Sequence, residues 1–327
     1  MHKLITICCW FGTLPEHFPE FSRSVAMNPT IDFLLVTDCQ IPNPPSNMSI
    51  YPCSFEEVRA RFQSLFDFPI CLEKPYKLCD FRPVWPLAFQ EFLNGYDFWG
   101  HCDMDMIFGD IRHFLSDETL SNHDKIYRLG HLSYYRNTNQ VTSRYLLDGG
   151  VNYHTVFTSP EGFAFDEIAG MGNIYSRHNY PAYYSLDYID ITYGKVRFTR
   201  SLFHVPAELH ASFNFEKQLF FWENGRVFRA YWFGNQIHQD EFNYIHFSKR
   251  KMPNHGVSEN SNSFFITNRG LFPKNGPVVF EDFDRYNPHE PKLEARRSRE
   301  CKRQARKNKN QYYLKIIKGK LGIQQGS

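Results

Sequence analysis

Two carboxylates, Asp103 and Asp105, interrupt the apolar and aromatic stretch YDFWGHCDMDMIFGDI at residues 96–111. Carboxylates held this close repel each other, and burial adds to the cost of keeping both ionised. A divalent cation such as Mn²⁺ or Mg²⁺ relieves both costs, because it prefers oxygen ligands and leaves positions open for substrate phosphates. The pair therefore indicates a metal site. The alternative is a polar strand end, where Asp103 caps a turn and Asp105 faces solvent.

Short apolar segments alternate with helical segments over the first third of the chain. The segments typical of buried strands are 3–12, 30–38 and 96–108, and those typical of helices are 14–29 and 54–66. The stretch 75–93 is typical of a loop that enters a helix, with Pro83 and Pro86 at the start of that helix. This alternation predicts an α/β fold with a mixed, mostly parallel sheet flanked by helices. Ligands of such sheets bind outside the carboxyl ends of strands. Asp38 and the Asp103/Asp105 pair both lie at such ends.

The stretch DFWGHCDMDMIFGDI, residues 97–111, resembles the metal-binding strand end of GT-A-fold glycosyltransferases. PYKLCDFRP, residues 75–83, resembles the Lys-x-x-Asp-x-Arg helix start of bacterial polysaccharide glycosyltransferases, and YIHFSKRK, residues 244–251, resembles a late His- and Lys-containing segment of several GT-A families. The resemblance spans residues 3–251. It implies a GT-A (Rossmann-like) fold. It also implies that the relatives of this chain are bacterial enzymes encoded in capsule or surface-polysaccharide gene clusters.

The resemblance also implies roles for individual side chains. Asp103 and Asp105 would bridge the metal and a diphosphate, His246 would complete the metal shell, and Lys249 would sit by the phosphates. Lys77, Asp80 and Arg82 would hold the nucleotide or donor sugar. The residues implied to contact the base and ribose are Trp10, Phe11, Gly12 and Asp38. Imidazole suits Mn²⁺ better than Mg²⁺, so a ligand role for His246 favours manganese. Each residue also has a simpler interpretation, as a core side chain, a strand end or a surface charge.

An acceptor-side segment is expected within residues 146–176, where Gly149 and Gly150 allow a ligand to approach the backbone. The sequence FDE places Asp166 and Glu167 in an aromatic setting. Asp166 is the predicted catalytic carboxylate, and Asp187 is the alternative. If the reaction inverts the anomeric configuration of the sugar, this carboxylate would act as a general base. The alternative is that Asp166 and Glu167 begin a helix and complement its dipole.

The charges divide the chain into an acidic body and a basic tail. Residues 292–320 contain twelve Lys or Arg and two Glu, whereas residues 1–291 contain 25 basic and 33 acidic residues. We predict a catalytic domain at 1–285, with a nucleotide-binding half at 1–115 and an acceptor half at 116–285. A basic, partly helical or disordered tail follows at 286–327. The apolar tail residues Tyr312, Tyr313, Leu314, Ile316, Ile317 and Leu321 suit an anionic membrane surface. A solvated helix is the alternative.

Localisation follows from the cysteines and the hydropathy. The eight cysteines form no CxxC pair, and a chain of 327 residues needs no disulfides to fold. No apolar run approaches the roughly 20 residues of a membrane span, and the first apolar segment is interpreted as a strand rather than a secretion signal. We expect a reduced, cytoplasmic protein that is peripheral at the inner face of the plasma membrane.

The resemblance and these observations predict a metal-dependent glycosyltransferase that acts in surface-polysaccharide synthesis. It would move a hexose from a nucleotide-diphosphate sugar to a saccharide or lipid-linked saccharide acceptor, and a UDP-sugar is the expected donor. One alternative is another metal-dependent nucleotide enzyme, a nucleotidyltransferase or phosphohydrolase, although the chain lacks a GxxxxGK[ST] phosphate loop. The other is a non-catalytic protein that binds carbohydrate or nucleic acid through the tail. Nucleic acid is the less expected partner, because no zinc finger or RNA-recognition motif accompanies the basic residues.

Overall fold

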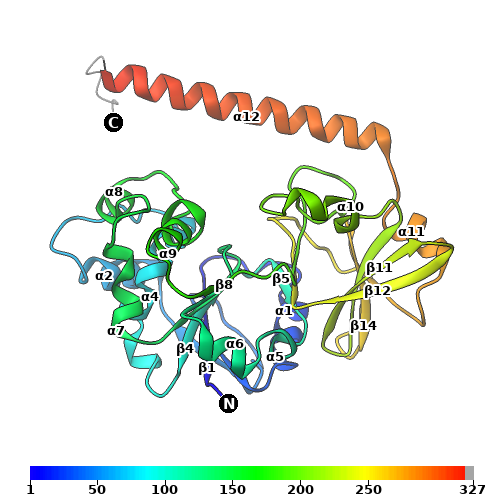
Figure 1. Ribbon diagram of the computed structural model, residues 1–327, viewed down its shortest axis with the longest axis horizontal. Helices are drawn as coiled ribbons and strands as arrows, with labels where there is room; N and C mark the ends of the chain where they lie inside the picture. Colours follow the sequence, from blue (N-terminus) through cyan, green and yellow to red (C-terminus); the bar gives the residue numbers. More distant parts are fainter. Residues whose placement is uncertain (321–327) are drawn as a thin grey trace.

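A computed structural model describes residues 1–320 and contains a mixed, mostly parallel main sheet (Figure 1). Its strands, in spatial order, are β3 (Met48–Pro52), β2 (Ile31–Thr37), β1 (Leu4–Trp10), β4 (Phe98–Cys102), β7 (Leu132–Arg136), β6 (Lys125–Ile126) and β8 (Ala182–Tyr183). Of the six neighbouring pairs, four are parallel, and only those that β7 makes with β4 and β6 are antiparallel. The predicted α/β fold class, a mixed and mostly parallel sheet flanked by helices, is confirmed.

Helices cover both faces of the main sheet because successive residues of its strands point to opposite sides. Ile5 and Ile7 of β1 belong to one apolar core, and Leu4 and Cys8 belong to the other. The helices that pack on the Ile5 side are α2 (Phe55–Gln63), α3 (Leu78–Phe81), α4 (Trp85–Ala88), α7 (Asn139–Thr142), α8 (Tyr153–Thr158) and α9 (Asn173–Arg177). Those on the Leu4 side are α1 (Phe18–Ala26), α5 (Ile111–Phe114) and α6 (Asp117–Asn122).

The predicted helices have different outcomes, and the one expected around 14–29 is confirmed as α1. The helix expected at 54–66 is α2, where the Ser54 hydroxyl accepts from the Glu57 backbone N–H and the Glu57 carboxylate accepts from the Ser54 N–H. The loop and helix expected within 75–93 are a succession of short helical turns. Pro83 and Pro86 each lie in the first turn of one of these elements, where the missing N–H costs no helical hydrogen bond.

A small three-stranded sheet adjoins the carboxyl end of β4. It consists of β5 (Met106–Phe108), β13 (Tyr244–His246) and β9 (Ile189–Asp190). β13 runs antiparallel to β5 and parallel to β9, so segments far apart in the sequence meet immediately beyond Asp103 and Asp105.

A five-stranded antiparallel sheet, which the sequence analysis did not predict, forms the right-hand part of Figure 1. Its strands, in spatial order, are β12 (Gln236–Phe242), β11 (Arg226–Phe233), β10 (Gln218–Glu223), β14 (Ser263–Thr267) and β15 (Gly270–Pro273), with α10 (His210–Phe213) and α11 (Phe280–Tyr286) nearby. Phe220 and Trp222 pack in one core with Ile107 and Ile245 of the small sheet. The division of the chain near residue 115 stays a prediction.

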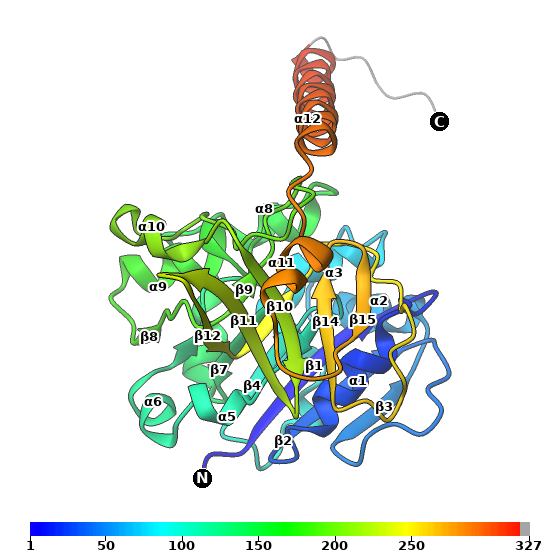
Figure 2. The same cartoon turned by 90° about the vertical axis from the view of Figure 1, so that its right-hand side faces the viewer.

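The basic segment forms α12 (Pro291–Lys320), which stands away from both large sheets in Figure 1 and in the turned view of Figure 2. Its first turn is attached to the body, since the Glu294 carboxylate accepts from the Arg197 N–H at 2.7 Å. Among the helices of residues 1–320, none is long and apolar enough to cross a membrane. Leu321, part of the predicted membrane-binding segment, lies outside the described residues.

Candidate metal centre

Asp103 and Asp105 lie where the main sheet passes into the small sheet. Asp103 follows β4 directly, and its N–H donates to the His131 carbonyl at 3.0 Å, so it is held in line with the β4–β7 pairing. Asp105 directly precedes β5, and its carbonyl accepts from the Phe247 N–H at 2.8 Å. The register between β13 and β5 brings in the third residue, because His246 of β13 pairs with Met106 of β5. The small sheet thus brings His246 to the two carboxylates.

The ligand atoms of Asp103, Asp105 and His246 lie within 4.8 Å of one another. His246 Nε2 is 3.4 Å from Asp105 Oδ1 and 3.7 Å from Asp103 Oδ2. On the other side of the ring, Nδ1 donates to Asp190 Oδ1 at 2.9 Å. This bond keeps the proton on Nδ1, so Nε2 faces the carboxylates and can bind a metal once it has released its own proton; a carboxylate commonly orients a metal-binding histidine in this way. Two oxygens and one imidazole nitrogen fit Mn²⁺.

Charge–charge interactions perturb the acid and base groups of this cluster. Burial raises the pKa of Asp105, but His246 and the Lys249 N–H outweigh burial and hold that pKa below its usual range. Burial likewise lowers the pKa of His246, yet Asp105 and Asp190 raise it well above the ordinary value. The cluster is therefore a strongly anionic position that attracts a cation, here the imidazolium itself.

Arg82 connects Asp103 to the predicted catalytic residue Asp166. Its Nη2 pairs with Asp103, while Nη1 donates to Asp166 Oδ2 at 2.8 Å and to the Gly130 carbonyl at 2.7 Å. Arg82 and Asp166 are 5 % and 2 % exposed. Burial raises the pKa of Asp166, and Arg82 opposes that rise. Asp166 is thus brought to the site, but one of its oxygens is occupied by the guanidinium.

Glu167 is the less buried of the two neighbouring carboxylates. Its Oε1 accepts from the Gly130 N–H at 3.0 Å. Burial, followed by repulsion from Asp166, raises the pKa of Glu167 to about 7. A Cβ added to Gly130 would lie 2.3 Å from Asp166 Oδ2 and 2.8 Å from Glu167 Oε1. Only glycine lets the backbone pass between these carboxylates and Arg82.

Lys77 and Asp80 form a buried internal pair at 2.8 Å. Asp80 also accepts from the N–H groups of Phe163 and Phe165, and Lys77 Nζ donates to the Glu161 carbonyl. The pair therefore anchors the segment that leads to Asp166 and Glu167. Both side chains are buried and bonded to other protein groups. Their predicted contact with a donor sugar stays a prediction.

Lys249 lies beside Asp105 on the loop after β13. Its N–H donates to Asp105 Oδ2 at 2.5 Å, and its Nζ donates to the Tyr76 hydroxyl at 2.8 Å. Ser248 and Lys249 have φ values of 51° and 63°, which are uncommon for residues with a side chain. This left-handed turn curls the loop around Asp105 and keeps the ammonium near the cluster.

The residues predicted to contact the base and ribose come together at the ends of β1 and β2. Asp38 Oδ1 accepts from the Gly12 N–H at 2.8 Å, and Gly12 has a φ of 92°, which favours glycine. The Trp10 indole donates to the Thr13 carbonyl at 3.1 Å, and Phe11 packs edge-to-face on Phe55. Asp38 is exposed, so its second oxygen is available to a ligand.

Asp187, the rival catalytic residue, lies apart from the cluster. Within residues 1–320, no hydrogen bond or ion pair joins it to Asp103, Asp105 or His246. Burial raises the pKa of Asp187, and its Oδ1 is buried without a hydrogen-bond partner.

Asp190, His131 and Gly130 were not predicted from the sequence, and Glu167 was not predicted as the catalytic residue. Asp190 and His131 reach the site only because β9 pairs with β13 and β7 pairs with β4. Nothing local in DYIDI or GHLS signals these long-range pairings. The FDE triplet did contain a signal for Glu167, but sequence alone does not tell which carboxylate is bound by an arginine.

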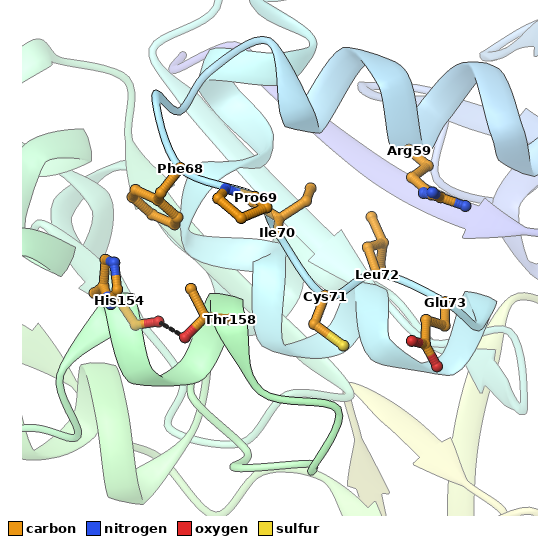
Figure 3. Close-up of a pocket in the computed structure, with 9 residues that line it drawn as sticks. All are labelled: Arg59, Phe68, Pro69, Ile70, Cys71, Leu72, Glu73, His154 and Thr158. Carbon is orange, nitrogen blue, oxygen red and sulfur yellow. Dashed lines mark hydrogen bonds between the residues drawn. The ribbon is translucent and has the colours of Figure 1, made fainter. Parts of the chain in front are cut away.

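A surface cavity of about 420 Å³ lies elsewhere, between the loop after α2 and helix α8 (Figure 3). Its wall includes Phe68, Cys71 and Glu73 from the loop, and His154 and Thr158 from α8. None of the predicted site residues lines this cavity, so it is separate from the metal centre.

Solved structures that resemble the chain include three glycosyltransferases, all at low identity. Galactosyltransferase LgtC, solved with donor and acceptor sugar analogues, is 10% identical with a TM-score of 0.27 over 40% of this chain and 57% of its own. Mouse xyloside xylosyltransferase 1, in the apo form, is 7% identical with a TM-score of 0.42 over 75% of this chain and 98% of its own. Glycosyltransferase GlyE of Streptococcus pneumoniae TIGR4 is 9% identical with a TM-score of 0.33 over 57% of this chain and 46% of its own. The matched part thus spans little more than half of LgtC and less than half of GlyE.

Sequence comparison gives one family and no individual relative. No functionally curated protein has a significantly similar sequence. The sequence profile of a family described as of unknown function, DUF6625, matches residues 6–275. That match covers most of the 327 residues and includes Asp103, Asp105 and His246. The chain therefore belongs to the DUF6625 family.

Proposed function

We propose that this protein is a metal-dependent glycosyltransferase that transfers a hexose from a UDP-sugar to a saccharide acceptor. The observation that carries the proposal is the convergence of Asp103, Asp105 and His246 at the carboxyl end of β4, with all ligand atoms within 4.8 Å. The Trp10–Gly12 segment and Asp38 lie at the carboxyl ends of the neighbouring strands β1 and β2. A nucleotide at the ends of these strands would direct its diphosphate toward the cluster.

Asp103, Asp105 and His246 would hold Mn²⁺, with Asp190 orienting the imidazole. When bound, the metal supplies positive charge against the diphosphate, where negative charge grows as the glycosidic bond breaks. Lys249 would add a second cation on the same side, because its N–H already contacts Asp105 and its ammonium is close by. Groups fixed before the reaction stabilise developing charge without reorganising during it.

The transfer breaks the bond between the sugar and the phosphate oxygen and forms a bond to an acceptor hydroxyl oxygen. The acceptor proton must then leave, and Glu167 is better suited to take it than Asp166. Asp166 is 2 % exposed and held by Arg82, whereas Glu167 is only partly buried and has a pKa raised to about 7. A base with a pKa near the working pH is effective. Arg82 would keep Asp103 and Asp166 in place.

Helix α12 would attach the enzyme to an anionic membrane surface, where lipid-linked saccharide acceptors of bacterial surface polysaccharides are extended. Its residues 291–307 contain eight Lys or Arg and two Glu. A juxtamembrane basic residue contributes about 1 kcal/mol of attraction to anionic lipid. The ribbon of the helix extends away from both large sheets in both views, although Glu294 and Cys301 near its start contact the body (Figure 2).

Donor turnover tests the proposal. Purified protein with Mn²⁺ is offered UDP-glucose, UDP-galactose and their N-acetyl forms with a saccharide panel, and released UDP is measured. We expect UDP release that requires Mn²⁺ and is lost in Asp105→Asn. Asp67→Asn is the matched control, because Asp67 is exposed and, among the described residues, has no hydrogen-bond or ion-pair partner. Equal turnover by Asp105→Asn and the wild type would refute the proposed mechanism.

A further inference from the structure

Arg128 lies in the loop between β6 and β7, two residues before Gly130. In the part of the chain that the structure describes, its guanidinium makes no hydrogen bond or ion pair, and its Nε is buried without a partner. The guanidinium lies over the Tyr184 ring, with Cζ 5.7 Å from the centroid. Leaving a buried donor unpaired is costly, so such a group calls for an explanation.

The other buried arginines do not share this state. Five of them also have a buried nitrogen without a partner, but each donates a hydrogen bond from another nitrogen of the same guanidinium: Arg82, Arg112, Arg144, Arg197 and Arg200. Their acceptors are carbonyl and carboxylate oxygens of the protein. Among the described arginines with a buried unpaired nitrogen, Arg128 alone has its whole fork of donors left for a group outside the chain.

The loop that carries Arg128 is held in an unfavourable backbone conformation. Tyr127 has a φ of 64°, which is rare for an aromatic residue, and its carbonyl accepts from the buried Lys125 Nζ at 2.7 Å. The same Nζ donates to Ser133 Oγ at 3.1 Å, which donates to the Leu129 carbonyl at 3.1 Å. Strained residues that their surroundings hold in place cluster at functional sites. The fold thus fixes the position of Arg128 before any ligand binds.

Arg128 lies beside the segment of the proposed general base. A Cβ added to Gly172 would lie 3.0 Å from the Glu167 carbonyl oxygen and 3.8 Å from Arg128 Nε. The groups proposed to face the donor diphosphate, in contrast, come from β4, β5 and β13 and the loop after β13. A ligand of Arg128 would therefore lie on the acceptor side of the site.

His204 adds a second donor near Arg128. Its Nε2 is buried without a hydrogen bond and can donate when it carries the proton. Burial and the charge of Arg128 lower the pKa of His204, so the two side chains are within electrostatic range of each other. Both are half-buried, and nearby Tyr184 and Phe203 are 36 % and 70 % exposed, so a ligand can approach from solvent. Aromatic side chains with a few polar groups between them are typical of ligand sites.

We propose that Arg128 and His204 bind an anionic group of the acceptor, so that the enzyme prefers a saccharide that carries a phosphate or a carboxylate. The fork of a guanidinium matches the oxygens of either group. A phosphate would come from the linkage between a saccharide and its lipid carrier, and a carboxylate from a uronic acid. The inference rests on the proposed function for the identity of the ligand as the acceptor. Anion binding by Arg128 can nevertheless be tested without a donor and without metal.

The probes are glucose 1-phosphate, glucuronic acid and neutral glucose, each titrated into full-length, metal-free protein and followed by ligand-observed NMR. We expect the wild type to bind at least one of the two charged sugars at least about tenfold more tightly than glucose, because hydrogen bonds between ions are stronger than neutral ones. Arg128→Met keeps an unbranched stem against Tyr184 but removes the donors, and should lose this preference. Arg128→Lys keeps the charge without the fork, and its affinity should be intermediate.

Arg285→Met is the matched control. Arg285 is exposed and lies over the Tyr286 ring at 5.3 Å, as Arg128 lies over Tyr184, but it belongs to α11. This variant should bind all three sugars as the wild type does. His204→Asn, in which the shorter amide tolerates the φ of 70°, should weaken binding of the charged sugars severalfold. Arg128→Gln replaces Arg128→Met if the latter does not fold.

Loss of the preference for charged sugars in Arg128→Met, but not in Arg285→Met, would support the inference. Tighter binding of glucose 1-phosphate would then assign a phosphate to the acceptor, and tighter binding of glucuronic acid a carboxylate. The inference is overturned if the wild type binds glucose as tightly as both charged sugars, or if Arg128→Met keeps the preference. Failure of UDP to bind with Mn²⁺ would contradict the proposed function alone, since these titrations use neither.

Discussion

Glu167→Gln should make the metal-free protein more stable above neutral pH. Burial and Asp166 raise the pKa of Glu167 from 4.5 to about 7, so the folded state holds a proton that the unfolded state has released in this range. The contribution of Glu167 to the free energy of unfolding is fully present below about pH 4.5 and is lost as the pH rises through about 7. A shift of this size corresponds to about 3 kcal/mol. Gln carries no charge at any pH, and its side-chain oxygen can still accept from the Gly130 N–H.

The assay is urea unfolding in EDTA from about pH 5 to about pH 8, where the difference in unfolding free energy gives the linkage directly. We expect the Gln variant to gain stability over the wild type as the pH rises, by up to about 3 kcal/mol at pH 8. Glu208→Gln, a change at an exposed residue, should follow the wild type throughout. If the difference between Glu167→Gln and the wild type were independent of pH, Glu167 would not have a raised pKa and its role as a base would lose its support.

Three further changes test other parts of the structure. Gly130→Ala places a methyl group 2.3 Å from Asp166 Oδ2, and we expect a loss of at least about 1–3 kcal/mol of unfolding free energy, measured in urea; unchanged stability would contradict the close packing. Asp190→Asn removes the carboxylate that orients His246, and should weaken Mn²⁺ binding about 10–100-fold by calorimetry, whereas wild-type affinity would mean that the hydrogen bond is irrelevant to the metal. Truncation after Pro291 should abolish salt-sensitive binding to vesicles that contain phosphatidylglycerol, because the basic helix is removed; binding that persists would assign membrane attachment to another surface.

Local sequence patterns were sufficient to predict the strands β1, β2 and β4 of the main sheet and the carboxylate pair. The apolar segments at β1, β2 and β4 have the continuous hydrophobic character of strands buried on both faces. Asp103 and Asp105 stand out because they interrupt such a segment, and neighbours in sequence need no long-range information to be recognised together. The resemblance of YIHFSKRK to a family motif added His246, and the structure brings that residue to the pair.

The parts that could not be predicted depend on pairing between distant segments. His246 meets Asp190 through the register of β13 on β9, which are separated by more than fifty residues. The charges of Lys77 and Arg82 predicted ligand contacts, which stay a prediction; the sequence did not show that Lys77 pairs with Asp80 and that Arg82 pairs with Asp103 and Asp166. Sequence gives the charge of such residues but not their burial. The five-stranded sheet was not predicted, because its strands pair antiparallel and do not follow the alternation of strands and helices on which the fold prediction depended.

The most direct test of the central claim is calorimetric titration of UDP into the wild type and Asp105→Asn, first with Mn²⁺ and then with EDTA. We predict that the wild type binds UDP only when Mn²⁺ is present. Asp105→Asn should show no measurable UDP binding, because it lacks a carboxylate that would hold the metal against the diphosphate. Failure of UDP, GDP, CDP and dTDP alike to bind with Mn²⁺, or equal binding by the wild type and Asp105→Asn, would contradict it.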